Sequence, residues 1–160
     1  GIQRRLERVA AGGPVRVVDD YAHNPAKIAA AWAAVAAPGN RVLGVWRPHG
    51  FGPLRTMLEP LANAFANVCR AQDQLWLLPV FDAGGTADRS INSGTLAARL
   101  EARGVFVATA PDYEWLGATL AATARAGDTI LLMGARDPYL PVFARAMAER
   151  TAPTQQPGNH

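Results

Sequence analysis

Most side chains of this 160-residue chain that could do chemistry lie in four polar segments. The densest is Asp19-Asp20-Tyr21-Ala22-His23-Asn24-Pro25, which places two carboxylates, a phenol ring and an imidazole close together. A carboxylate at the end of a strand can accept both hydroxyls of a ribose, and an aromatic ring can cover a base. Asp20 or Asn24 could instead cap a following helix that starts at Pro25. Capping alone needs neither Tyr21 nor His23, so the composition of the segment favours a functional site.

The other three segments are basic or rich in glycine. Residues 47–55 carry Arg47, His49 and Arg55, and a guanidinium fork binds carboxylate or phosphate through two hydrogen bonds. An exposed basic loop explains this segment equally well. Residues 134–138, Gly-Ala-Arg-Asp-Pro, could hold an anion at a helix start or form a plain turn capped by its aspartate. Residues 81–92 contain two adjacent glycines without the spacing of a phosphate-binding fingerprint.

Several common site motifs are missing from the sequence. Neither a P-loop nor G-x-G-x-x-G is present. His23 and His49 with Asp20 could hold a metal ion, but a loop pair with flexible glycines gives thin support. Cys69 is interpreted as a core residue rather than a nucleophile. The four tryptophans are expected at core positions: Trp32, Trp46, Trp76 and Trp115.

Short apolar runs alternate with amphipathic segments, which indicates strands alternating with helices. The expected strands lie at 3–10, 15–18, 42–46, 75–78, 105–107 and 129–133. Ser93 and Asp112 are expected to cap two of the helices. The expected apolar helix faces are Ile28, Trp32 and Val35; Leu58, Leu61, Phe65 and Val68; Leu96 and Leu100; Leu116 and Leu120; and Leu140, Phe143, Ala144 and Met147.

This alternation predicts an α/β fold: a Rossmann-like, doubly wound, mostly parallel sheet with helices on both faces. Segment 3–10 precedes the repeating units and is expected to pair antiparallel at one edge. Ligands bind at the carboxyl ends of parallel strands, so the loops 19–25, 47–55 and 134–138 should meet there. We expect one domain over residues 1–150 and a disordered tail over 151–160.

Composition narrows the function classes. The chain has 16 basic and 13 acidic residues, a net charge of +3 and a pI near 9.6, but the basic residues are scattered singly among acids. We therefore expect no nucleic-acid partner. No apolar run approaches the roughly 18 residues of a membrane span, and the charged first residues do not resemble a signal peptide. A single cysteine is compatible with the cytoplasm.

Taken together, these segments resemble the C-terminal domain of the Mur ligases over residues 1 to about 150. Within that family they are similar to the branch that holds UDP-N-acetylmuramate–L-alanine ligase and the murein tripeptide ligase. The opening residues 1–7 resemble G-x-x-R-R-x-E, and residues 19–25 resemble D-D-Y/F-G/A-H-H-P. Residues 46–49 resemble F-Q-P-H, 81–85 resemble Y-x-A-G-E, and 133–137 resemble M-G-A-G-D.

The resemblance implies one domain of a larger ATP-dependent, amide-forming ligase of peptidoglycan synthesis or recycling. An N-terminal domain would bind the UDP-N-acetylmuramate-type substrate, and a central P-loop domain would hold most of the ATP and magnesium. The C-terminal domain would close over them and present an amino acid, L-alanine or similar, or a peptide. The substrate carboxylate would react through an acyl phosphate, so this fragment, whether natural or excised, should not catalyse alone.

The resemblance also assigns roles to individual residues. Asp20 and Tyr21 match nucleotide-binding positions. The residues expected near the amino-acid substrate are His23, His49, Arg47, Arg55 and Arg136. Those expected to shape the loops are Asp19, Asn24, Gly134 and Asp137. No residue is assigned to a metal ion.

The sequence departs from the family pattern at several places. Asn24 replaces the second histidine, and Gly50 and Pro53 stand where the alanine-adding enzymes have the R-x-x-R pair that holds the amino-acid carboxylate. Arg47 and Arg136 stand where the family has other residues. A displaced arginine could take over carboxylate binding, so the resemblance points to the ligase class and leaves the amino acid open.

Two other functions remain open on the residues alone. One is a freestanding metal-dependent hydrolase that uses Asp19, Asp20, His23 and His49. The other is a Rossmann-like interaction domain, without enzymatic activity, whose arginine loops bind an acidic partner.

Overall fold

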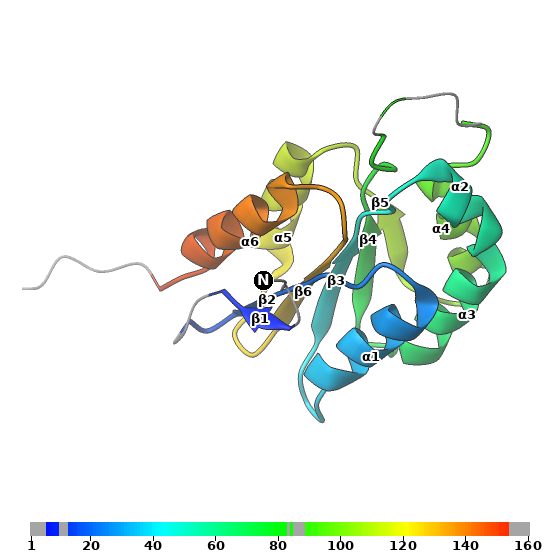
Figure 1. The fold of residues 1–160 in the computed structure, drawn as a ribbon. Helices are drawn as coiled ribbons and strands as arrows, with labels where there is room; N and C mark the ends of the chain where they lie inside the picture. Colours follow the sequence, from blue (N-terminus) through cyan, green and yellow to red (C-terminus); the bar gives the residue numbers. More distant parts are fainter. Residues whose placement is uncertain (1–5, 10–12, 83, 85–88, 154–160) are drawn as a thin grey trace, which may run out of the picture.

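A computed structural model of the chain describes residues 6–9, 13–82, 84 and 89–153. In these residues one sheet has the strand order β1-β2-β6-β3-β4-β5 (Figure 1). The parallel strands are β2 (Arg16–Asp20), β3 (Val42–Trp46), β4 (Gln74–Leu77), β5 (Val107–Thr109) and β6 (Thr129–Met133). Strand β1 (Glu7–Arg8) pairs antiparallel with β2 at the sheet edge. The predicted mostly parallel sheet with one antiparallel edge strand is confirmed.

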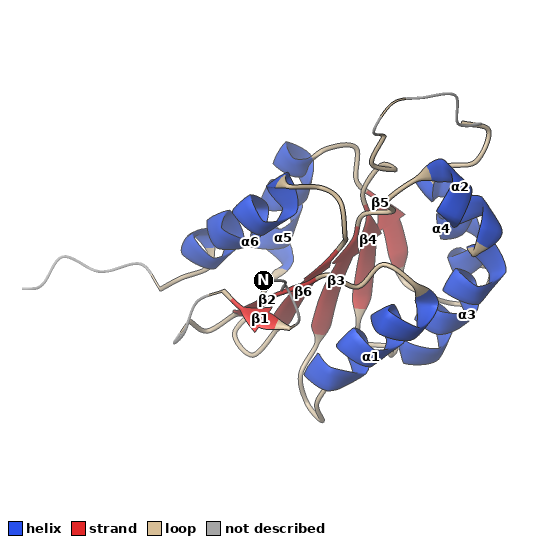
Figure 2. Ribbon diagram, viewed as in Figure 1, coloured by secondary structure: helices blue, strands red, loops and turns tan. Residues whose placement is uncertain are grey.

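Helices cover both faces of this sheet (Figure 2). On one face lie α1 (Pro25–Val35), α2 (Phe51–Thr56), α3 (Leu58–Val68) and α4 (Ser93–Glu101), and on the other α5 (Tyr113–Thr123) and α6 (Tyr139–Arg150). Strand β3 shows why both faces are covered. Val42 and Trp46 belong to the core under α1 and α3, whereas Leu43 and Val45 belong to the core under α5 and α6. Alternate side chains therefore enter two separate cores, as expected for a strand buried on both sides.

Several element boundaries differ from the sequence prediction. Strand β2 extends through Asp19 and Asp20, which pair in parallel register with Leu132 and Met133 of β6. The long partner strand satisfies their backbone groups and so overrides the low strand propensity of aspartate. Residues 51–56, predicted as loop, form α2 with Leu54 buried. Its proline is the third helical residue, within the first turn, where a missing N–H costs little.

Strand β5 starts two residues later than predicted. The N–H of Val105 still bonds to the carbonyl of Leu100 at the end of α4. The N–H of Leu75 donates to the carbonyl of Phe106, and Val107 is the first residue with a register partner in β4, Leu75.

The helix caps correct one expectation and confirm another. Asn92, not Ser93, caps α4: its side chain accepts from the N–H of Thr95 and completes a capping box. The Ser93 hydroxyl instead donates to the carbonyl of Leu78 at 2.6 Å. Asp112 caps α5 as predicted, by accepting from the N–H of residue 115.

Among the tryptophans, Trp32, Trp46 and Trp76 are buried, but Trp115 is 41% exposed, so its predicted core position is wrong. It lies in the first turn of α5, and the apolar stripe of that helix is formed by Leu116 and Leu120. Residues 3–5 and 10 of the expected first strand, and residues 154–160 of the expected tail, lie outside the described residues.

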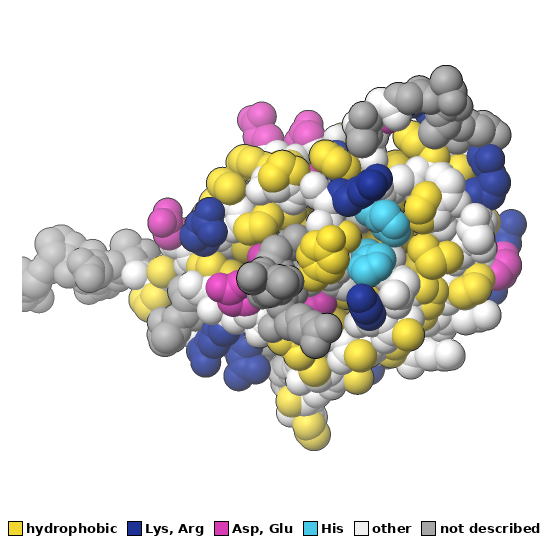
Figure 3. Space-filling model, viewed as in Figure 1, with side chains coloured by type: hydrophobic (Ala, Val, Ile, Leu, Met, Phe, Trp, Pro, Cys, Tyr) yellow, Lys and Arg dark blue, Asp and Glu magenta, His cyan; other side chains and the backbone are white. Residues whose placement is uncertain are grey.

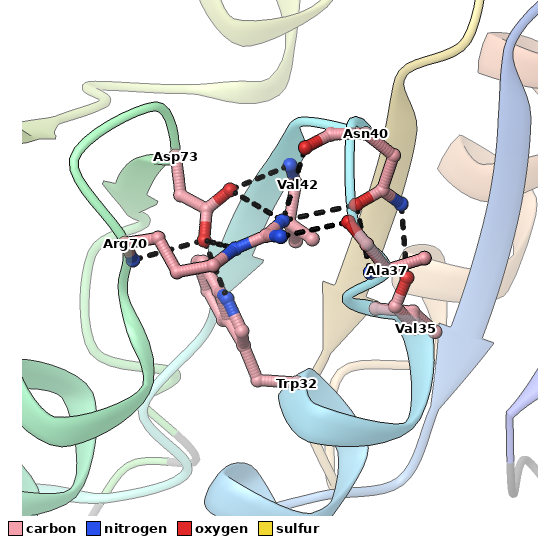
Figure 4. Close-up of polar contacts among 7 residues, drawn as sticks. All are labelled: Trp32, Val35, Ala37, Asn40, Val42, Arg70 and Asp73. Carbon is pink, nitrogen blue, oxygen red and sulfur yellow. Dashed lines mark hydrogen bonds and ion pairs between the residues drawn. The ribbon is translucent and has the colours of Figure 1, made fainter.

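A buried polar cluster lies at the amino ends of β3 and β4 (Figure 4). This is the end of the sheet opposite the polar loops. The Asp73 carboxylate, 2% exposed, accepts from the indole N–H of Trp32 and the backbone N–H of Val42. Arg70 donates to the same carboxylate and to the carbonyls of Ala37 and Asn40 after α1. This cluster therefore joins the end of α1, the start of β3 and the turn before β4.

Candidate functional site

The carboxyl ends of β2, β6 and β3 lie side by side, and the loops that follow them meet there (Figure 1). Backbone hydrogen bonds continue the pairing past the strand ends. The N–H of Gly134 donates to the carbonyl of Asp20 at 3.2 Å, and the N–H of Arg47 donates to the carbonyl of Met133 at 3.0 Å. We call residues 21–24, 47–50 and 134–138 the carboxyl rim. The topology thus brings together the three loops that the sequence singled out.

Two histidines from different loops are in contact on this rim. The rings of His23 and His49 lie edge to face with centroids 5.4 Å apart, and the ring of Tyr21 lies 5.6 Å from that of His23. Figure 3 shows the two imidazoles next to each other on the surface, with basic side chains on either side. Burial, His23 and the charge of Arg136 together hold the pKa of His49 below its ordinary value. His49 is therefore neutral near pH 7, in a setting where an added anion would be attracted.

Asp20 and Tyr21 lie beside a hollow between the start of the described chain and α1. Each Asp20 oxygen accepts a backbone N–H at 2.7 Å, one from Leu6 and one from Ala22. The Tyr21 ring is 44% exposed, and Lys27 joins both residues in lining a cavity of about 390 Å³. The sequence analysis did not single out Lys27. Lys27 lies in the first turn of α1, directly after the rim loop, and this position is the signal from which the sequence could have placed it near the site.

The residues expected to shape the loops occupy structural positions. Asp19 is 3% exposed near the carboxyl end of β2, which lies between β1 and β6. Asn24 caps α1 by accepting from the N–H of Lys27, so the capping role falls to Asn24 and not to Asp20. Gly134 is a site of close approach, because a Cβ there would lie 2.9 Å from Leu140 Cδ2.

The three candidate arginines have different surroundings. Arg47 lies between the rings of Phe81 and Tyr113, and its Nη1 is 3.5 Å from Asp137 Oδ2. Arg55 is exposed on α2 and donates to the hydroxyl of Ser90 at 3.3 Å, away from the histidines. Arg136 is exposed in the rim, and its charge reaches His49.

Sequence reasoning missed one member of the rim's surroundings. Tyr113, the first residue of α5, donates its hydroxyl to Asp137 Oδ2. It follows strand β5, whose carboxyl end lies at the same edge of the sheet as the rim, so the rule that located the other loops could have found it.

The described residues do not support the metal-dependent hydrolase. Within them, no group of three or more His, Cys, Asp or Glu side chains is arranged to hold a metal ion. Both oxygens of the Asp20 carboxylate accept from backbone amides, those of Leu6 and Ala22. Cys69 is no candidate nucleophile either, because burial and the neighbouring Asp73 raise the pKa of its thiol to about 12.

The fold is that of a Rossmann-like α/β domain, a class in which ligands bind at the carboxyl ends of the parallel strands. Residues 4–136 match the family model described as "Mur ligase, glutamate ligase domain", and the chain therefore belongs to the Mur ligase family. It is 34% identical over 142 residues to a UDP-N-acetylmuramate–L-alanine ligase of Mycolicibacterium gilvum, a match that covers 86% of this chain and 28% of that protein. The chain thus spans less than a third of the length of this relative.

Two solved structures have the same fold. The UDP-N-acetylmuramate-alanine ligase from Thermotoga maritima has a TM-score of 0.69 at 20% identity, over 94% of this chain and 30% of that one. A murein peptide ligase from Psychrobacter arcticus has a TM-score of 0.69 at 17% identity, over 94% and 30% of the two chains. In the described part of this chain, no helix combines the length and the apolarity needed to cross a bilayer.

Proposed function

We propose that this chain is the C-terminal domain of an ATP-dependent ligase that joins an amino acid or peptide to a UDP-N-acetylmuramate-type substrate. L-Alanine or a similar amino acid is the proposed addition, and the domain, over residues 1–150, acts with N-terminal and central domains of the same cytoplasmic enzyme. The observation that carries the proposal is the meeting of His23, His49 and Arg136 beside the Tyr21 hollow, in a member of the Mur ligase family.

The Tyr21 hollow fits the nucleoside part of ATP. An exposed aromatic ring can cover a base, and a carboxylate beside it, such as that of Asp20, can accept hydrogen bonds from ribose hydroxyls. Among the described residues that line the hollow, Asp20 is the one acidic side chain, so we assign the triphosphate and the magnesium ion mainly to the central domain. Bound there, ATP and magnesium would supply the phosphoryl group that activates the carboxylate of the muramate substrate. The residues of this chain orient the ribose and the incoming amine.

We assign the carboxylate of the incoming amino acid to Arg136 and the histidine pair. Arg47 is engaged with Asp137, and Arg55 lies against Ser90, whereas Arg136 is exposed in the rim beside His49. A neutral His49 can donate one hydrogen bond to a carboxylate while Arg136 supplies the charge. Arg136 thereby takes the place of the arginine pair that the resemblance led us to look for at residues 50 and 53.

The test is an ADP-release assay of the full-length ligase with magnesium, UDP-N-acetylmuramate and a panel of amino acids and peptides. We expect Arg136→Ala to raise the KM for the amino acid about 10- to 100-fold, the value of a charge-assisted hydrogen bond. The KM for ATP should stay the same. Arg145→Ala is the matched control, since Arg145 is an exposed arginine on α6 outside the rim.

Asp20→Ala should raise the KM for ATP and leave the KM for the amino acid unchanged. Two results would contradict the proposed function. One is a rate of ADP release that is the same with and without the muramate substrate for every amino acid and peptide of the panel. The other is tight, magnesium-dependent binding of ATP to the 160-residue chain alone, measured by calorimetry.

A further inference from the structure

Three polar side chains form a buried cluster next to the histidine pair: Arg47 and Asp137 from the rim, and Tyr113 from the start of α5. The Tyr113 hydroxyl, at the start of α5, donates to Asp137 Oδ2 in the turn between β6 and α6. Arg47, from the end of β3, lies 3.5 Å from the same oxygen. The other oxygen, Asp137 Oδ1, accepts from the N–H of Tyr139 at 2.9 Å. One carboxylate thus joins three segments that are distant in the sequence.

The cluster is largely shielded from water. Asp137 is 6% exposed, and the side chain of Arg47 is 18% exposed between two aromatic rings. Burial and the hydrogen bond to Asp137 raise the pKa of the Tyr113 phenol, so the phenol stays a donor at any physiological pH. Among the described residues, Arg47 Nε is buried without a hydrogen-bond partner. Replacing a buried ion pair by well-packed apolar side chains is often neutral or stabilising. Stability of the fold alone therefore does not explain why Arg47 and Asp137 are charged.

The position of the cluster suggests what it does. Asp137 directly follows Arg136, and the turn is held at its other end by the hydrogen bond from Gly134 to Asp20. Gly134 also packs against Arg47, whose Cβ and carbonyl would each lie 3.4 Å from an added Cβ. Both ends of the turn that carries Arg136 are therefore fixed, one by backbone pairing and one by the cluster.

We propose that Tyr113, Asp137 and Arg47 are positioning residues: they hold the turn that carries Arg136 in place in the rim, next to the loops of His23 and His49, and so set the affinity for the amino-acid carboxylate. This inference rests on the proposed function, because it names what orients the carboxylate-binding arginine. Arg47 acts here as an internal brace rather than as a contact of the substrate.

The first test needs no enzymatic activity. In the 160-residue chain, the titration of the imidazole carbon-bound protons by NMR gives the pKa of His49, which the charge of Arg136 holds down together with burial and His23. Tyr113→Phe removes only the hydroxyl and keeps the ring contacts with Tyr139 and Phe143. We expect the pKa of His49 to rise in this variant, and to rise in Arg136→Gln as well.

Tyr139→Phe is the control, because it removes a hydroxyl from the neighbouring ring, which is 47% exposed. It should leave the pKa of His49 unchanged. An unchanged pKa in Tyr113→Phe, with Arg136→Gln raising it, would overturn the positioning role. It would do so whether or not the enzyme has the proposed activity.

The second test uses the full-length ligase. Tyr113→Phe should raise the KM for the amino acid about tenfold, close to the value of one hydrogen bond to a charged group. The kcat and the KM for ATP should match those of Tyr139→Phe. A fall in kcat with no change in KM for the amino acid would refute the inference. If the wild-type enzyme shows no ligase activity while the NMR result holds, the proposed function fails and the positioning of Arg136 stands.

Discussion

Replacing Asp73 by alanine should destabilise the domain more than any other single change at the amino ends of the strands. The carboxylate accepts five hydrogen bonds, one from Trp32, one from Val42 and three from Arg70 (Figure 4). Alanine would leave the indole N–H of Trp32 and the backbone N–H of Val42 buried without an acceptor. Neither group can turn towards water, because the indole lies in the core and the amide begins β3.

The expected loss follows from these groups. Each buried donor left without a partner costs about 1–3 kcal/mol, and breaking a buried ion pair from one side costs about 3–5 kcal/mol. The two estimates describe the same loss, so they are not added. A loss of about 3–5 kcal/mol is a large fraction of the roughly 5–15 kcal/mol that stabilises a domain. The melting temperature should fall by about 6–20 °C.

Urea unfolding followed by tryptophan fluorescence measures this loss. Asp82→Ala is the matched control, because Asp82 forms an ion pair with Arg89 in which both side chains are well exposed. It should hardly move the urea midpoint. If the midpoints of the two variants were equal, the cluster would not support the fold and the reasoning would be refuted.

The stabilisation that the Asp73 carboxylate provides should depend on pH. Burial acts to raise the pKa of Asp73, but the hydrogen bonds from Arg70, Val42 and Trp32 outweigh it, and the pKa lies below its ordinary value of 3.8. A lowered pKa in the folded state stabilises the fold above the unfolded pKa, and this stabilisation is lost as the pH falls through the folded pKa. The difference between wild type and Asp73→Ala should therefore be full at neutral pH and shrink below about pH 4.

Two further predictions concern the core. Gly44→Ala should destabilise the domain by about 1–3 kcal/mol or more, because the new Cβ would lie 2.1 Å from Trp32 Cζ3. Urea unfolding measures this loss of stability. An unchanged urea midpoint would mean that the Trp32 indole can move aside without cost, and would contradict the prediction. Cys69 should react slowly with iodoacetamide at pH 8 in the folded chain and rapidly in urea, because its pKa is raised to about 12. Equal labelling rates in both states would contradict this assignment.

The local chemistry of the sequence determined much of the fold. Alternating apolar runs and amphipathic segments specify parallel strands joined by helices, because each pattern buries one type of surface. The predicted cap at Asp112, and the cap at Asn24, one of the two alternatives that the sequence left open, follow from side chains that satisfy free N–H groups within the same turn. Local signals failed where a tertiary partner decided: β6 extends β2 through two aspartates, and the leucine of α2 anchors a glycine- and proline-rich segment as a helix.

The candidate site divides in the same way. The sequence by itself determined which loops would carry it, because ligands bind at the carboxyl ends of parallel strands and the unusual polar residues follow those strands. Only the tertiary structure decided how these residues are used. The strand order β2-β6-β3 places His23 against His49, and the meeting of three distant segments turns Arg47 inward onto Asp137 and Tyr113 while Arg136 remains exposed. Contacts between segments that lie far apart in the chain depend on packing, and no local pattern of residues encodes which of two arginines will face the solvent.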